Sequence, residues 1–332
     1  MKVASGAVLG CAAVNEHISK QIPETLWHYT TFTGFQGIFN SKKIWATEYR
    51  FLNDQEEFNH AKLLAQELVA EEPEFTGVCF PARETIRSAV DIAFNTGPLH
   101  EERLRIMVAS FSEKGDQLSQ WRGYAGDSTG VSIGLDLRGL RPPAEIGTTV
   151  TFAPCVYKEK DKRTLLKAVF AQFRNGLQEW WDSVVDAALT QPLGSAESGL
   201  TFGQKVVAEH SKEFREVHER CHTVLLFDLM RIAPLLKNES FDEEKEWRLV
   251  LPSESIHYPT KQPIEFRPIR DALVPYIAYP LLMPNQDGEI LCKSLILGPG
   301  SHASAEVGAN MFFRSKFIPL SAQRSKIPYR PA

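Results

Sequence analysis

The segment from residue 241 to residue 252 (FDEEKEWRLVLP) changes abruptly from acidic to apolar, and this change limits how the chain can fold there. From Trp247 onward, apolar residues recur at every second position, which is typical of a β-strand with one buried face. The apolar side carries Trp247, Leu249 and Leu251, and the opposite side carries Glu246, Arg248 and Val250. Because proline has no backbone N–H to donate, we expect this strand to end at Pro252.

Two carboxylates, Glu244 and Glu246, stand at the start of this strand. In an extended chain they point the same way, roughly 6–7 Å apart. Neighbouring carboxylates raise each other's pKa and can divide the roles of general acid and general base. The alternative is a solvated acidic loop that enters an ordinary strand, with Glu246 and Arg248 as a surface ion pair. The local sequence leaves both interpretations open.

The composition is that of an ordinary soluble globular protein, with 43% hydrophobic and 23% charged residues. The formal net charge of −4 argues against a broad surface for nucleic acids or anionic membranes. The five cysteines are scattered singly, so we expect reduced thiols in a cytoplasmic protein. The apolar run over residues 3–14 is a poor signal peptide. No later segment reaches the ~18 apolar residues of a membrane span, so no membrane partner is expected.

Short segments rich in β-branched and aromatic residues predict the strands of a central sheet. They lie at residues 26–31, 44–47, 106–111, 130–137, 148–157 and 294–298. Helices are expected over residues 33–40, 82–94 and 301–313, and another after an N-cap at Asn53 or Asp54. We therefore predict an α+β fold.

A different pattern begins near residue 160, where apolar residues recur at spacings of three and four over about seven turns. These residues are Leu166, Phe170, Phe173, Leu177, Trp181, Val184 and Ala188. A polar loop over residues 191–199 and a second helical pattern over residues 204–236 follow. We expect a helical hairpin at about 160–236, either as cover for the sheet or as a specificity module. It would be inserted into a single domain of residues 24–332, after an amino-terminal tail of residues 1–23.

Polar residues on two predicted strands are candidates for a site. His28, Tyr29 and Thr30 follow one another on the first strand, and all three can form hydrogen bonds. Ser110 and Ser112 place two hydroxyl groups on one face at the end of a later strand. Strand histidines and strand-end serines also have common structural roles, so each group has a structural alternative.

The segment 120–126 (QWRGYAG) is expected to form a loop before the strand that starts at residue 130. Trp121 and Tyr124 could stack on a planar ring, and Arg122 could bind a phosphate through two hydrogen bonds. A structural loop anchored by a buried Trp121 is an equal alternative.

Metal binding and a nucleophilic serine are not indicated. His218 and His222 have the four-residue spacing of many metal ligands on helices, but no carboxylate motif accompanies them. No glycine-flanked serine elbow is present. We therefore expect no metal.

Several motifs together carry a family resemblance. In chain order they are 26–30 (LWHYT), 44–47 (IWAT), 52–54 (LND) with Glu57, 110–112 (SFS), 120–124 (QWRGY), 130–134 (GVSIG), 244–249 (EKEWRL), 296–299 (ILGP) and 327–330 (IPYR). With these motifs the chain resembles the mostly uncharacterised bacterial family called domain of unknown function 2971. The resemblance covers nearly the whole chain and implies no established activity.

A more distant resemblance concerns mechanism. The ADP-ribosyltransferase superfamily has a histidine or arginine on its first strand, a serine or tyrosine on a second strand and a glutamate on a later strand. Here His28, the Ser110–Ser112 motif and Glu246 stand in that order. The resemblance implies a central, mostly antiparallel sheet similar to the split sheet of that superfamily. It also implies that NAD is the substrate.

The resemblance assigns roles around a bound NAD. Glu246 would stabilise the positive charge that develops on the ribose when the nicotinamide leaves. Ser110 or Ser112 would support Glu246, and Glu244 would orient the acceptor or take its proton. His28, with Tyr29 and Thr30 beside it, would bind the ribose of the adenosine half. The remaining contacts would come from the 120–126 segment: Tyr124 and Trp121 would stack on a ring, and Arg122 would meet the pyrophosphate.

We therefore expect an ADP-ribosyltransferase-like enzyme that modifies a macromolecule, protein or nucleic acid, as a toxin or phage-defence effector. One alternative is a metal-dependent nucleic-acid-processing or nucleic-acid-binding protein, in which carboxylates hold a divalent ion. Its site would combine Trp121, Arg122, Tyr124, Asp54, Glu57, Glu244 and Glu246, with Asn53 and Arg248 as neighbouring candidates. Another alternative is a non-catalytic module that binds a partner protein through the helical hairpin.

Overall fold

The alternating segments form strands in the structure, a computed structural model. It describes residues 10–52, 55–73, 82–94, 105–126, 128–140, 150–190, 210–253, 263–269, 272–281 and 292–328. The chain divides into two compact units. The helical unit comprises residues 1–17, 56–100 and 158–236, and the sheet unit comprises residues 18–55, 101–157 and 237–332. The expectation of one domain with an inserted hairpin stays a prediction.

The sheet unit contains a ten-stranded sheet in the described part of the chain. The strand order is β10-β9-β4-β1-β3-β2-β8-β7, and β3 also pairs with β6, which pairs with β5. The strands are β1 (Leu26–Thr30), β2 (Lys43–Glu48), β3 (Arg105–Ser112), β4 (Val131–Leu135), β5 (Thr151–Pro154), β6 (Glu246–Ser253), β7 (Glu265–Ile269), β8 (Ala272–Pro280), β9 (Cys292–Leu297) and β10 (Ala322–Arg324). Only β9 and β10 pair in parallel among these strands, so the predicted α+β class and mostly antiparallel sheet are confirmed.

The sheet divides along one edge of β3. On its other edge β3 pairs with β6 over its whole length, from Arg105 to Ser112. On the dividing edge it pairs with β2 at Met107 and Val108 and with β1 at Ser112. The backbone of Ser110 therefore lies between two strands that diverge from β3, and a side chain can reach it there.

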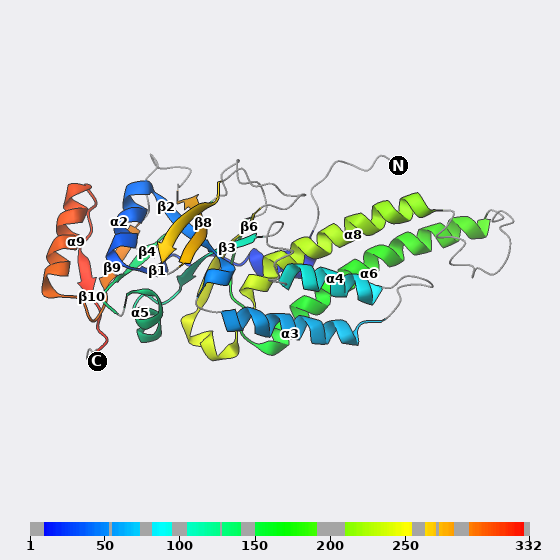
Figure 1. Ribbon diagram of the computed structural model, residues 1–332, viewed down its shortest axis with the longest axis horizontal. Helices are drawn as coiled ribbons and strands as arrows, with labels where there is room; N and C mark the ends of the chain where they lie inside the picture. The colour runs from blue at the N-terminus through cyan, green and yellow to red at the C-terminus, as the bar shows by residue number, and fades with distance from the viewer. Residues whose placement is uncertain are drawn as a thin grey trace. The chain divides into compact units, whose positions relative to one another are not determined.

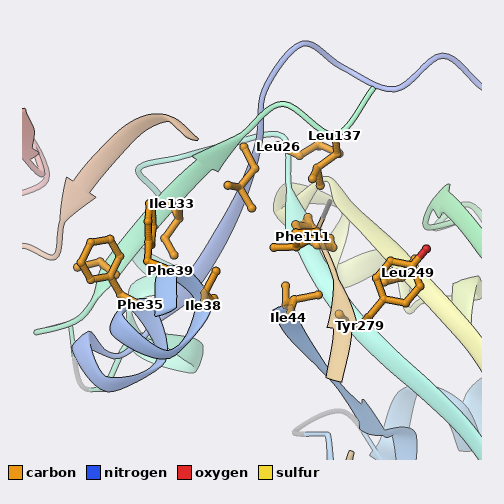
Figure 2. Packing of buried hydrophobic residues seen from close by; sticks show 14 of the residues in the cluster. Leu26, Phe35, Ile38, Phe39, Ile44, Phe111, Ile133, Leu137, Leu249 and Tyr279 are labelled. Atoms are coloured by element: carbon orange, nitrogen blue, oxygen red, sulfur yellow. The ribbon is translucent and has the colours of Figure 1, made fainter. Parts of the chain in front are cut away.

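One face of the sheet carries the main hydrophobic core (Figure 2). Alternate residues such as Leu26, Ile133 and Leu249 point into it, as the period-two patterns predict. Helices α2 (Phe32–Ser41) and α9 (Ala303–Ser315) cover this face with phenylalanine side chains. The Thr31 hydroxyl caps the start of α2 by accepting a hydrogen bond from the Gly34 N–H, and Lys42 ends the helix in a left-handed conformation.

The opposite face of the sheet carries helix α5 (Leu118–Tyr124). The sequence suggested a loop here, but the chain forms a short helix because Trp121 is fully buried and packs edge-on against Tyr29 of β1, with ring centroids 4.8 Å apart. The remaining short helices of the sheet unit are the 3-10 turns η1 (Tyr49–Phe51) and η4 (Glu239–Glu244).

Strand β6 continues one residue beyond Pro252, where we expected it to end. Pro252 lies opposite Ile106 of β3. Residues an even number of positions apart on a strand point their backbone N–H and C=O groups toward the same side. The backbone groups of Glu246 bond to Tyr157 and Cys155, away from β3, and Pro252 stands an even number of residues further along β6. The missing N–H of Pro252 therefore points away from β3 and breaks no bond between these strands.

The helical unit is built from long amphipathic helices, which lie side by side in Figure 1. They are α3 (Gln55–Glu71), α4 (Ala82–Phe94), α6 (Glu159–Thr190) and α8 (Ser211–Ile232), with α1 (Ala12–Ile18) and the 3-10 turn η3 (Ala233–Leu235). Helix α8 packs against both α4 and α6. The repeated apolar residues of α6 are buried from Leu166 to Leu177. The predicted loop over residues 191–199 lies outside the described residues.

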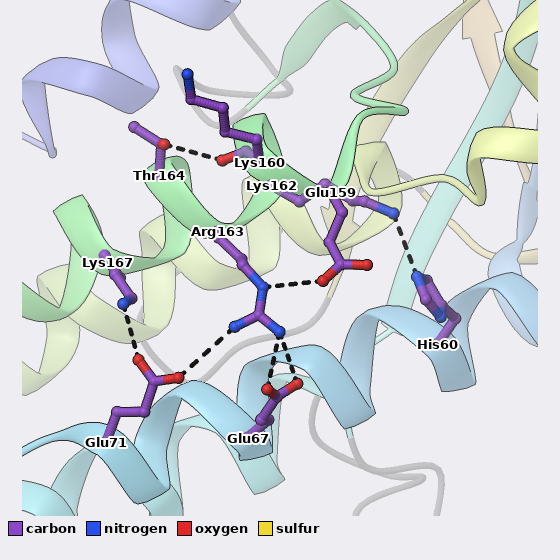
Figure 3. A network of polar contacts seen from close by, with 9 residues as sticks. All are labelled: His60, Glu67, Glu71, Glu159, Lys160, Lys162, Arg163, Thr164 and Lys167. Atoms are coloured by element: carbon purple, nitrogen blue, oxygen red, sulfur yellow. Dashed lines mark hydrogen bonds and ion pairs between the residues drawn. The ribbon is translucent and has the colours of Figure 1, made fainter.

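A charge network joins the exposed faces of α3 and α6 (Figure 3). The Arg163 guanidinium donates to Glu67 at 2.8 Å and to Glu159 at 2.9 Å, and the Lys167 ammonium pairs with Glu71 at 2.7 Å. Single exposed ion pairs contribute little to stability. We therefore infer that the network mainly fixes how α3 and α6 are aligned along each other. Among the helices in the described parts of the chain, none combines the length and apolarity needed to cross a bilayer.

The packing of α2 can be tested with a matched pair of substitutions. Phe35 is 3% exposed and contacts Phe39, Phe312 and Phe313, whereas Phe32 on the same helix is 36% exposed. Replacing Phe35 with alanine should lower the free energy of unfolding by about 3–5 kcal/mol, because it leaves a cavity. Phe32→Ala should cost less than about 1 kcal/mol. Urea denaturation measures both, and equal losses would contradict this packing.

Candidate functional site

His28 of β1 reaches the backbone of β3 where the sheet divides. Its Nδ1 lies 2.9 Å from the carbonyl oxygen of Ser110. Because a carbonyl only accepts, Nδ1 carries the proton, and in the neutral ring Nε2 is left as an acceptor. Burial lowers the pKa of His28 against the raising effect of this hydrogen bond, and the positive charge of Arg267 lowers it further. The imidazole is therefore neutral near pH 7 and presents an acceptor nitrogen.

The turn from η4 into β6 sets the positions of the two predicted glutamates. The Asn238 side chain caps η4 by accepting from the Ser240 N–H, and Lys245 adopts a left-handed conformation at φ 46°. This left-handed residue redirects the chain, so Glu244 ends the 3-10 turn and Glu246 begins the strand. The two residues are not consecutive same-side positions of one strand, as the sequence suggested, yet both are buried.

Both carboxylates meet at the ammonium group of Lys237, which is fully buried. Lys237 Nζ donates to Glu244 Oε2, and it donates to Glu246 Oε2 at 2.6 Å. Arg248, on the same side of β6, donates from Nε to Glu246 Oε1 at 2.7 Å and from Nη2 to Oε2 at 3.0 Å. Two cations and two carboxylates thus form one buried network.

The network determines the charge of Glu246. Burial alone would raise its pKa, but Arg248 and Lys237 outweigh burial and lower the pKa from 4.5 to about 2. The sequence indicates that Glu244 and Glu246 raise each other's pKa and can divide the roles of general acid and general base. That expectation is wrong for Glu246, because an ammonium group lies between the two carboxylates. Glu246 is a permanent carboxylate at physiological pH.

The backbone of Glu246 is held by the segment that follows β5. The Glu246 N–H donates to the Tyr157 hydroxyl at 2.7 Å, and the Glu246 carbonyl accepts from the Cys155 N–H at 2.8 Å. Burial raises the pKa of Tyr157, so its phenol stays protonated. Hydrogen bonds therefore hold both the backbone and the side chain of Glu246, the first residue of β6.

A cavity of about 50 Å³ lies beside these groups. It is lined by Trp27, His28, Tyr29, Ser110, Phe111, Gln120, Tyr124 and Glu246. Five of the predicted site residues thus line one cavity: His28 and Tyr29 of β1, Ser110 of β3, Tyr124 of α5 and Glu246 of β6. The volume suits a small chemical group rather than a whole nucleotide, so a nucleotide would place one of its groups there.

Tyr29 and Trp121 mainly support the wall of this cavity. The Tyr29 hydroxyl donates to the Lys114 carbonyl at 2.8 Å and accepts from the Gln117 N–H. The Trp121 indole N–H donates to Asp116 at 2.8 Å. Asp116 also accepts from the Ser325 hydroxyl at 2.6 Å and from the Lys326 N–H, so the C-terminal segment holds α5 in place. Of the two aromatic residues predicted on this segment, Tyr124 lines the cavity and Trp121 does not.

Other predicted residues lie around the cavity without lining it. The Ser112 hydroxyl donates to the Glu244 carbonyl at 2.6 Å and so secures the start of β6. Thr30 ends β1, and Arg122 is exposed on α5. Arg248 belongs to the buried network described above.

The remaining candidates cannot be placed. Asn53 and Asp54 lie outside the described residues, as does the side chain of Glu57. Within the described residues, no group of three or more histidine, cysteine, aspartate or glutamate side chains is arranged to hold a metal ion.

Residues of the site that were not predicted from the sequence include Lys237, Tyr157, Gln120 and Trp27. Lys237 follows the apolar end of the second helical pattern, where a lysine usually reaches solvent, so nothing local indicates that it is buried. Tyr157 ends a predicted strand and Gln120 begins the predicted loop, and either could have been included by proximity to the motifs.

Comparison with known proteins finds a similarity for part of the chain. Residues 120–249 match the model of a family described as Protein of unknown function (DUF2971). The match extends from Gln120 on α5 to Leu249 on β6 and includes Glu246, so it supports the family resemblance for this part of the chain. No curated protein and no solved structure matches the chain.

The charge of Glu246 predicts how stability depends on pH. Because its pKa is lowered on folding, its ionised form stabilises the protein above the ordinary value of 4.5, and this contribution is lost as the pH falls toward 2. Glu246→Gln should therefore be less stable than wild type at pH 7 and lose less stability on acidification to about pH 3.

Urea denaturation across this pH range measures the difference. Glu306→Gln is the control, since Glu306 is partly exposed and pairs only with Arg324 among the described residues. Equal pH dependence in wild type and Glu246→Gln would show that Glu246 is not held ionised by its neighbours.

Proposed function

We propose that this protein is an ADP-ribosyltransferase-like enzyme that cleaves NAD and transfers ADP-ribose to a macromolecule. One observation carries the proposal: the imidazole of His28, the residue Ser110 and the carboxylate of Glu246 line a single cavity. These residues are far apart in sequence and stand in the order that the ADP-ribosyltransferase resemblance requires. The division of the sheet along β3 also supports the proposal, because it lets His28 of β1 reach the backbone of Ser110 beside the cavity.

Glu246 would act on the reacting sugar. When the bond between ribose C1′ and the nicotinamide nitrogen breaks, its electron pair neutralises the pyridinium ring and positive charge develops on the ribose. A carboxylate held ionised beside the sugar stabilises that charge more than it stabilises the ground state. The acceptor then bonds to C1′ and loses its proton to solvent. Because Glu246 is permanently ionised, its role is electrostatic rather than proton transfer.

The Glu246 carboxylate retains capacity for one ligand contact. A carboxylate has about four lone-pair sites. Among the described residues, Lys237 and Arg248 donate three hydrogen bonds to it. A sugar hydroxyl could donate to the remaining site on Oε1, which would fix the ribose against the carboxylate.

The other cavity residues suit a ring and its hydroxyl groups. The acceptor Nε2 of His28 can receive a hydrogen bond from a ribose hydroxyl. Trp27 and Tyr124 provide aromatic surface for stacking, and the Gln120 amide can donate and accept. Arg122, exposed on α5, remains the candidate for the pyrophosphate.

The proposed biological role is that of a toxin or phage-defence effector, with a protein or nucleic acid as acceptor. A nuclease that holds a divalent ion has less support, because the carboxylates of Glu244 and Glu246 already pair with the ammonium of Lys237. A ligand cation would have to displace that ammonium.

The proposal predicts that Glu246→Gln lowers NAD turnover by at least about 100-fold, as loss of a preorganised electrostatic group does. Release of nicotinamide from labelled NAD measures turnover, and circular dichroism checks that the variant is folded. Asp242→Asn is the matched control: Asp242 lies in the same acidic segment, pairs with Lys245 and does not line the cavity. It should retain wild-type turnover. A wild-type protein that neither binds nor consumes NAD would refute the proposed function.

A further inference from the structure

Lys237 is enclosed in the sheet unit and has two carboxylate partners. Its backbone N–H donates to the Val156 carbonyl at 3.0 Å, and its side chain has no exposed surface. The ammonium lies 5.1 Å from the centre of the Phe241 ring, a distance suited to a cation–π contact. Glu244 and Glu246 accept its hydrogen bonds.

A buried ammonium is costly unless its charge is balanced. Here two basic side chains, Lys237 and Arg248, meet two carboxylates, those of Glu244 and Glu246. Arg248 alone could neutralise Glu246 through its two hydrogen bonds. Burial of the Glu246 carboxylate therefore does not by itself require the pair formed by Lys237 and Glu244. This pair lies next to the cavity.

We propose that Lys237 is a positioning residue, which fixes the Glu246 carboxylate at the edge of the cavity while Glu244 serves as its counter-ion. This inference rests on the role proposed for Glu246. Lys237 does not line the cavity and would not touch the substrate. Lys237 donates its hydrogen bond to Oε2 of Glu246, whereas Oε1 accepts from Nε of Arg248.

The inference gives Glu244 a role other than the one expected from the sequence. There it was to orient the acceptor or take its proton. In the structure its side chain is buried against Lys237 and does not line the cavity. As a counter-ion it lowers the cost of burying Lys237 and takes no part in the reaction.

Removal of Lys237 should also change how activity depends on pH. The titratable and charged groups around Glu246 include Lys237, Arg248, Glu244, Tyr157 and Cys155, and His28 and Tyr124 line the same cavity. Without the ammonium, burial raises the pKa of Glu246 with only Arg248 to oppose it, so Glu246 would take up a proton at higher pH.

The test compares Lys237→Met, Lys237→Arg and Glu244→Gln. Lys162→Met is the control, because Lys162 is the other fully buried lysine among the described residues and lies in the helical unit, next to His60. For Lys237→Met we expect kcat for NAD to fall about tenfold or more, KM to change by less than about threefold, and an acidic limb to appear in the pH profile. Lys237→Arg should restore most of kcat and remove the limb. Lys162→Met should keep wild-type kcat. Glu244→Gln should lower kcat less than Lys237→Met does, because Lys237 keeps its hydrogen bond to Glu246.

A wild-type kcat and pH profile in folded Lys237→Met would overturn the inference. Should Lys237→Met fail to fold, Lys237→Gln decides: a lowered kcat with an acidic limb in the folded protein supports the inference, and a wild-type kcat and pH profile contradicts it.

Carboxyl carbon NMR separates this inference from the proposed function. With the Glu246 signal assigned through Glu246→Gln, titration should show that signal unchanged above about pH 4 in wild type and Lys162→Met, but titrating at higher pH in Lys237→Met. If wild type leaves NAD intact and this shift is still observed, the proposed function fails and the influence of Lys237 on Glu246 stands. If the signal does not shift, the inference about Lys237 fails whatever the activity.

Discussion

The buried contact between Glu246 and its two cations is the interaction on which the candidate site depends. A carboxylate in a protein interior without partners would take up a proton or unfold its surroundings. Here Lys237 and Arg248 keep it charged at the edge of a cavity. Such networks are expensive to bury and add little net stability, which makes a functional explanation attractive. In the proposed reaction this arrangement gives Glu246 an electrostatic role rather than one in proton transfer.

The position of His28 depends on the edge of β3 along which the neighbouring strand changes from β2 to β1. Where β2 and β1 diverge, the carbonyl of Ser110 is satisfied by His28 instead of by a strand. This one hydrogen bond fixes the tautomer of the imidazole and places it near the first residue of β6. The cavity is therefore a consequence of strand pairing, and its polar groups are carried by strands and by helix α5 rather than by loops, which favours precise placement.

Much of the fold could be predicted from sequence, because it follows from local patterns. The β-branched and aromatic composition of β1 and β3, the alternation in β4 and β6 and the three–four spacing in α6 are all local signals. Strands β7 and β8 were not predicted, since prolines interrupt their segment and only long-range pairing reveals them. Chain order suggested that His28, Ser110 and Glu246 belong together. The role of Lys237 could not be predicted, because the partners of a buried charge depend on tertiary contacts that leave no local signal.

The central claim is that the cavity between β1 and β6 binds NAD through the groups that line it. The most direct measurement is a heteronuclear NMR titration of the wild-type protein with NAD, with signals of the cavity residues assigned. We predict saturable shifts concentrated at His28, Ser110, Gln120 and Tyr124, with smaller effects across the helical unit. An absence of shifts at these residues, or saturable shifts confined to another surface, would contradict the account.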